Sequence, residues 1–148
     1  MKIDVGKVAM RMGSHYPKPF DEPCRNKSRR PLGRAAGLTH FGVNLLELAP
    51  GAWSSQRHWH PNADEFVYVL RGRVVLVVDS AETILETGDC AAFLAGNPEG
   101  HHLQNRDAEA ALILEVGTAG SAAALTEYSD IDLRATNAGY FHKNGGQY

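Results

Sequence analysis

From residue 40 onward the chain alternates short apolar runs with turn residues, and this pattern strongly limits its possible folds. Turn residues such as Pro50-Gly51 and Gly88-Asp89 separate the runs, a rhythm typical of β-sandwiches and barrels. No amphipathic helical segment alternates with the runs, which argues against a parallel α/β sheet. The runs predict strands at Phe41–Leu48, Glu65–Leu70, Arg73–Val78, Thr83–Leu85, Cys90–Leu94, Leu103–Gln104 and Ala110–Val116.

Length and charge place these strands in one small domain with no polyanionic partner. The 148 residues suit a single domain, and 15 Lys and Arg against 17 Asp and Glu give a net charge of -2. This balance argues against binding to nucleic acid or to an anionic membrane surface. No apolar run, Val74–Val78 included, is long enough to span a bilayer.

The two cysteines indicate a reducing compartment. Cys24 and Cys90 are far apart and match no metal or redox spacing. No apolar segment typical of a signal peptide follows Met1, because the charged residues Asp4, Lys7 and Arg11 interrupt it. We expect a cytoplasmic protein.

The regions flanking the strands differ from them in composition. Residues 1–37 contain four prolines and the basic stretch Arg25–Arg30, and they predict an N-terminal arm that wraps a neighbour or a second subunit. Residues 38–118 form the predicted barrel core, and 119–148 an extension packed on the barrel or on a partner subunit. Within this extension Ser121–Glu127 favours a helix, and the tail beyond Asn137 is expected to be loosely ordered or docked on a neighbour.

Four of the seven histidines lie in two clusters, and the first has the spacing of a metal site. In a strand, His58 and His60 project from the same face. A short turn follows, and the next strand opens with Glu65, whose carboxylate would pair beside the two imidazoles. Because an unpartnered carboxylate is costly among apolar residues, a cation accounts for this arrangement.

The second cluster, His101-His102, opens a later strand. Its two side chains point to opposite faces, so at most one can join the first set. The residues leave the choice between them open.

The order of these residues resembles the cupin superfamily. The first cupin motif is matched by Gly51, His58-Trp59-His60, Glu65 and Gly72, with one extra residue before the first histidine. The second motif is matched less closely. Gly88, Gly96, His101 and Asn105 fit it, but Leu94 replaces its proline and two extra residues precede His101. Counting back from Asn105 favours His101 over His102.

The resemblance implies a single jelly-roll β-barrel that holds a metal ion. Carried onto this chain, the ligands would be His58, His60, Glu65 and His101, and the ion one divalent transition metal: Fe, Mn, Ni, Co or Zn. Such barrels commonly pair through their sheets, which makes a homodimer the expected assembly. The family includes dioxygenases, decarboxylases, isomerases and lyases, so it leaves the reaction open.

The alternation of side chains along the strands adds candidate residues around the metal. Gln56 and Ser54 share the face of the first two histidines, where they would orient a ligand or contact substrate, although Gln56 is equally well explained as a polar residue at the barrel mouth. Val67, Val69 and Leu103 are expected to line a largely apolar pocket.

Two functions fit this picture. The first is a metal-dependent enzyme acting on a small organic molecule. Oxygenation is slightly favoured, because no second acid or base stands out on the inward face. The second is a non-catalytic cupin that binds or senses a small ligand.

Overall fold

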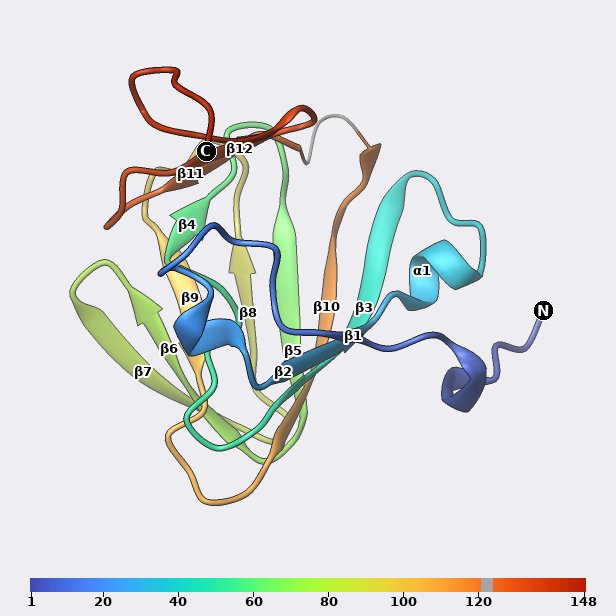
Figure 1. Ribbon diagram of the computed structural model, residues 1–148. Coiled ribbons are helices and arrows are strands. Elements are labelled where there is room, and N and C mark those ends of the chain that lie inside the picture. Colours follow the sequence, from blue (N-terminus) through green and yellow to red (C-terminus); the bar gives the residue numbers. More distant parts are fainter. Residues whose placement is uncertain (121–123) are drawn as a thin grey trace.

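The chain forms two antiparallel β-sheets that enclose one core, as the strand pattern predicted (Figure 1). The structure is a computed structural model that describes residues 1–120 and 124–148. The first sheet runs in the order β1 (Arg11–Met12), β2 (Lys27–Arg30), β3 (Phe41–Leu48), β10 (Ala111–Thr118), β5 (Glu65–Arg71) and β8 (Cys90–Phe93). The second runs β13 (Gly139–Phe141), β12 (Arg134–Thr136), β11 (Thr126–Tyr128), β4 (His58–Trp59), β9 (His101–Gln104), β6 (Arg73–Val78) and β7 (Ala81–Glu86).

Helices are few and short. Within residues 1–119 and 125–148 they are the 3₁₀ turns η1 (Val5–Lys7) and η2 (Glu22–Cys24) and the single turn α1 (Leu32–Ala35), which packs on β3. In the described parts of the chain, no helix has the length and apolar character needed to cross a membrane. The two antiparallel sheets and the scarcity of helix confirm the expected all-β jelly roll.

Alternate residues of the strands build the core. Leu46 of β3 pairs with Ile113 of β10, which pairs with Val69 of β5, and all three side chains are fully buried. The second sheet adds Val74 and Leu103 to the same cluster. Because strand side chains alternate between faces, this row fixes which residues of β3, β5 and β10 point inward.

All seven predicted strands are present, and β3 and β6 match their predicted bounds residue for residue. The helix expected at Ser121–Glu127 is wrong at its C-terminal end, where Thr126–Tyr128 forms β11 and pairs with β4. Positions 121–123 of that prediction lie outside the described residues. Tertiary pairing outweighs the helical propensity of the neighbouring alanines here.

The terminal regions pair with the rest of the chain. In the N-terminal arm, β2 pairs with β3 and β1 with β2, so the basic stretch forms part of the first sheet. In the tail, β12 and β13 form a hairpin, and the Tyr148 hydroxyl donates a hydrogen bond to the carbonyl of Asp132. The tail therefore docks on its own chain, where the sequence suggested loose order or a neighbour.

Gly72 closes the tight turn between β5 and β6, and we expect its replacement to destabilise the fold. Its φ is +83°, and a Cβ there would lie 3.0 Å from Ala111 Cα and 3.2 Å from the Ala110 carbonyl oxygen. Gly72→Ala combines left-handed strain with overpacking and should lower the free energy of unfolding by about 2–5 kcal/mol in urea titrations.

Gly51→Ala is the matched control for this prediction. Gly51 has a similar φ of +79°, but a Cβ added there would meet no other atom within 4 Å. This variant should lose only the backbone contribution, about 1–2 kcal/mol. Equal losses in the two variants would show that the contact with β10 is unimportant.

Candidate metal centre

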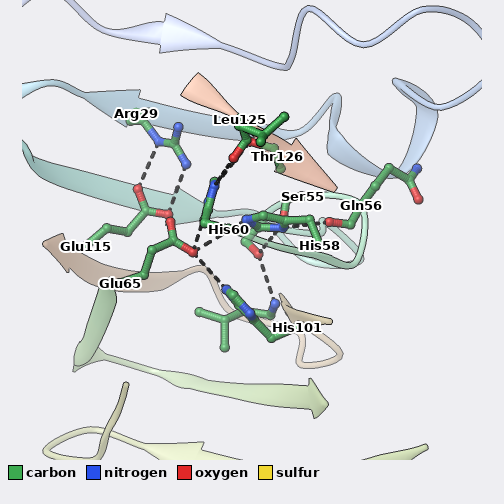
Figure 2. A network of polar contacts seen from close by, with 12 residues as sticks. Arg29, Ser55, Gln56, His58, His60, Glu65, His101, Glu115, Leu125 and Thr126 are labelled. Carbon is green, nitrogen blue, oxygen red and sulfur yellow. Dashed lines mark hydrogen bonds and ion pairs between the residues drawn. The ribbon is translucent and has the colours of Figure 1, made fainter. Parts of the chain in front are cut away.

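Three histidines converge on one oxygen of Glu65 (Figure 2). His58 lies on β4 and pairs in register with His101 at the start of β9, while Glu65 opens β5 in the opposite sheet. The Nε2 atoms of His58, His60 and His101 lie 3.5, 3.4 and 2.8 Å from Glu65 Oε2. The histidines of the two motifs, which are far apart in sequence, thus meet at one point between the sheets.

Backbone carbonyls orient the first two imidazoles. His58 Nδ1 lies 3.0 Å from the Gln56 carbonyl oxygen and 3.1 Å from Ser55 Oγ. His60 Nδ1 lies 3.2 Å from the Leu125 carbonyl oxygen and 3.2 Å from Thr126 Oγ1. Since a carbonyl only accepts, each Nδ1 carries a proton, and each Nε2 faces Glu65. There Nε2 donates a hydrogen bond when the ring is protonated and offers a lone pair to a metal ion when the ring is neutral.

The carboxylate of Glu65 is held in its ionised form. Burial by itself raises the pKa of Glu65, but hydrogen bonds with His101, His58 and His60 outweigh burial and hold this pKa well below its usual range. At neutral pH Glu65 is therefore an anion surrounded by imidazole nitrogens, which is the state in which a carboxylate ligates a metal.

His101 and His102 have clearly different surroundings. The ring of His101 stacks on Phe93, with centroids 3.5 Å apart and planes 1° apart, and its Nε2 faces Glu65. Both ring nitrogens of His102 have protein partners: Nδ1 donates to the Ser55 carbonyl at 3.0 Å, and Nε2 accepts from Gln104 Nε2 at 2.9 Å. Burial lowers the pKa of His102 to about 4, so this ring is neutral at neutral pH.

The donor set suits a metal ion of the type expected. His58, His60 and Glu65 each offer a ligand atom, and these atoms all lie within 4.8 Å of one another. His101 falls outside that group, but it lies in contact with its carboxylate. Imidazole nitrogens with a single carboxylate oxygen suit Fe, Mn, Ni, Co or Zn.

The other predicted site residues are divided between the cavity and its surroundings. Ser54, Val67 and Leu103 line a cavity of about 400 Å³ that contains the histidines. Val69 is instead fully buried in the core. The side chain of Gln56 donates to the Phe20 carbonyl, and it is the backbone carbonyl of Gln56 that orients His58.

The cavity has a lining of both polar and apolar side chains rather than the largely apolar one expected, because it includes polar groups that were not predicted from the sequence. Glu115 of β10 pairs in register with Val67 and so shares the inward face of Glu65. Arg29 of β2 contacts its carboxylate through two of its nitrogens: Nη2 donates a hydrogen bond to Oε1 at 3.0 Å, and Nε lies 2.9 Å from Oε2 (Figure 2). The signal was available, since Ala111, Ile113 and Glu115 follow the period of two along one predicted strand.

The family is established by comparison with known proteins. The model of the cupin domain matches residues 44–117, half of the chain. The chain is a cupin. Of the curated proteins, the tetracenomycin polyketide synthase protein TcmJ of Streptomyces glaucescens is 32% identical over 72 residues. That match covers 49% of this cupin and 46% of the relative, so the aligned region spans about half the length of TcmJ.

Two solved structures resemble this cupin over most of its length. A cupin from Silicibacter pomeroyi described as a sugar phosphate isomerase is 41% identical, with a TM-score of 0.91 over 100% of this chain and 96% of its own. A candidate sugar phosphate isomerase from Acidithiobacillus ferrooxidans is 25% identical, with a TM-score of 0.74 over 87% of this chain and 82% of its own.

Proposed function

We propose that this cupin is a metal-dependent enzyme that isomerises a phosphorylated sugar. The observation that carries the proposal is the convergence of three imidazoles on Glu65 inside a cavity that also holds a second carboxylate, Glu115. A cavity of about 400 Å³ is in the range that accommodates a small ligand. The similarity along the whole chain to the Silicibacter pomeroyi protein supports the choice of reaction.

His58, His60, Glu65 and His101 would hold one divalent ion, as the sequence predicted. Bound there, the metal would polarise a carbonyl or hydroxyl oxygen of the substrate. The carbonyls of Gln56 and Leu125 would keep the histidine lone pairs directed at that position.

The remaining chemistry of an aldose–ketose isomerisation is proton transfer, for which we assign Glu115. The reaction moves one proton from a carbon to the neighbouring carbon and a second proton from the hydroxyl on that carbon to the former carbonyl oxygen. One base that becomes an acid is sufficient for the carbon-bound proton. Arg29 fixes the carboxylate of Glu115 in the cavity through a hydrogen bond from Nη2 and an ion-pair contact at Nε. Burial raises the pKa of Tyr16 and of Tyr128, so these phenols of the cavity wall remain protonated.

The presence of Glu115 shifts the preferred reaction from oxygenation to isomerisation. Oxygenation was favoured because no second acid or base stood out on the inward face. Glu115 is such a group, and it makes proton transfer the better-supported chemistry. We therefore prefer isomerisation to oxygenation, decarboxylation or elimination.

The experiment that tests this function follows an aldose phosphate and the corresponding ketose phosphate by ¹H and ³¹P NMR with metal-replete protein. An isomerase interconverts the two, and chelation stops the interconversion. A non-catalytic binding cupin, the alternative function, would shift the resonances of the ligand without turnover, and that outcome would contradict the proposal.

We further propose a cytoplasmic homodimer that pairs through the first sheet. The outward face of β5 exposes Phe66, Tyr68 and Leu70 at 38–41% of their surface, an apolar strip that a second copy would cover. Light scattering that gives the mass of one chain would contradict this assembly.

A further inference from the structure

Lys27 is a buried cation that the metal centre does not use. Its side chain lines the cavity, yet the residue is only 6% exposed. Its amine donates to the carbonyl of Ser54, and within residues 1–120 and 124–148 no carboxylate lies at ion-pair distance from it. An ammonium has three N–H donors, so two of them remain free to serve a ligand.

Such a group is unusual, because buried charges are normally paired. Burial and the neighbouring Arg29 lower the pKa of Lys27 to about 8. This value still leaves most of the amine protonated at pH 7. The cavity wall therefore contains a positive charge without a counterion.

The surrounding charges add to this excess. The inward face of β2 carries Lys27 and Arg29, and Arg11 of β1 pairs in register with Arg29 and also lines the cavity. Against these three cations the cavity has two carboxylates. Glu115 is engaged by Arg29, and Glu65 by the three histidines. A metal ion at Glu65 would make the cavity more positive still.

A hydroxyl without a partner lies in the same wall. Ser14 Oγ is buried, and among the described residues it has no hydrogen-bond partner. Together with the free donors of Lys27, it forms a wall rich in donors and poor in acceptors, which is the character of a site for an oxyanion.

We propose that Lys27 anchors an anion-binding site in the cavity, which takes the phosphate group of the substrate. A phosphate monoester offers three acceptor oxygens and up to two negative charges, enough to satisfy the free donors and offset the excess charge. That the phosphate belongs to a sugar rests on the proposed function, whereas the binding of phosphate itself does not.

The test measures binding of inorganic phosphate to metal-free protein by isothermal titration calorimetry. We expect wild-type protein to bind phosphate and Lys27→Met to bind it about 10- to 100-fold more weakly, the usual effect of losing hydrogen bonds from a charged group. Methionine keeps the length of the side chain and removes a buried charge, so the variant should fold.

Arg30→Met is the matched control. Arg30 lies on the same strand but its guanidinium donates to the Val8 carbonyl, away from the cavity, so this variant should bind phosphate as wild type does. Acetate serves as the carboxylate probe and should bind much more weakly than phosphate. Equal binding of phosphate by wild type and Lys27→Met, no binding by wild type, or equal binding of acetate would each overturn the proposal.

Turnover separates this proposal from the proposed function. With an active isomerase, Lys27→Met should raise KM about 10- to 100-fold and change kcat much less. If phosphate binds through Lys27 but no sugar phosphate is isomerised, the proposed function fails and the anion site stands. If isomerisation occurs with an unchanged KM in Lys27→Met, the anion site fails and the function stands.

Discussion

Replacing Glu115 with glutamine should lower the isomerisation rate by about 10²- to 10⁴-fold, the range that a positioned acid–base group contributes. Glutamine preserves the shape of the side chain and cannot accept the proton from carbon. The metal ligands are untouched, so the metal content should equal that of wild type. The rate is measured by NMR, together with the exchange of the substrate's carbon-bound proton with deuterated solvent.

The exchange measurement distinguishes the loss of a proton-transfer group from a loss of stability. Glu115→Gln leaves Arg29 without its carboxylate partner, which would itself destabilise the fold to some extent. Loss of stability alone would not abolish proton exchange in the fraction that remains folded. Glu47→Gln is the control, because Glu47 forms an ion pair with Arg71 on the outside of the sheet, at 3.2 Å. Proton exchange at the wild-type rate in Glu115→Gln would remove Glu115 from the mechanism.

Removing the carboxylate of the metal centre should have the second large effect. Glu65→Ala deletes the oxygen on which the three imidazoles converge, and it should weaken binding of Co²⁺ or Mn²⁺ by at least about 100-fold. The outer partners of metal ligands alone account for about 10- to 100-fold, so a direct ligand should account for more. Affinity is measured by titrating metal-free protein and following the change in absorbance or calorimetric heat.

His102→Ala provides the contrast. Both ring nitrogens of His102 are occupied by Ser55 and Gln104, so its loss should change metal affinity by less than about 10-fold. It is also a buried residue, and it therefore reports how far a general loss of packing affects the site. Equal losses in Glu65→Ala and His102→Ala would show that the second motif has been aligned to the wrong histidine.

The sequence contained most of the barrel and the proposed metal ligands, because both depend on short-range patterns. Apolar alternation located the strands of the barrel core, and the spacing from His58 to Glu65 reflects a single turn between two strands. The position of His101 required the family motif, since residues so far apart in sequence meet only through the pairing of β4 with β9.

The cations of the cavity could not be predicted in the same way. Lys27–Arg30 is short and polar, with none of the β-branched or aromatic residues that mark a strand, and its pairing with β3 is what makes it one. Once β2 is formed, alternation turns Lys27 and Arg29 inward. The charged stretch that the sequence places in an arm around a neighbour or a second subunit thus forms part of the cavity wall.

The sequence also does not predict how deep a residue lies within the barrel. Val67 and Val69 share one face of β5, yet Val67 reaches the cavity and Val69 is enclosed by the core. Parity gives the face of a strand but not the position along the barrel axis. That position depends on how far the opposite sheet and the neighbouring loops extend over the residue.

The central claim, that this cupin is an enzyme dependent on one metal ion held by His58, His60, Glu65 and His101, is tested most directly by titrating the activity of metal-free protein with a divalent metal. Activity should be absent after chelation and should rise linearly to a sharp break at about one equivalent of metal per chain. Full activity in the chelated protein, or metal that binds without restoring turnover, would contradict the account.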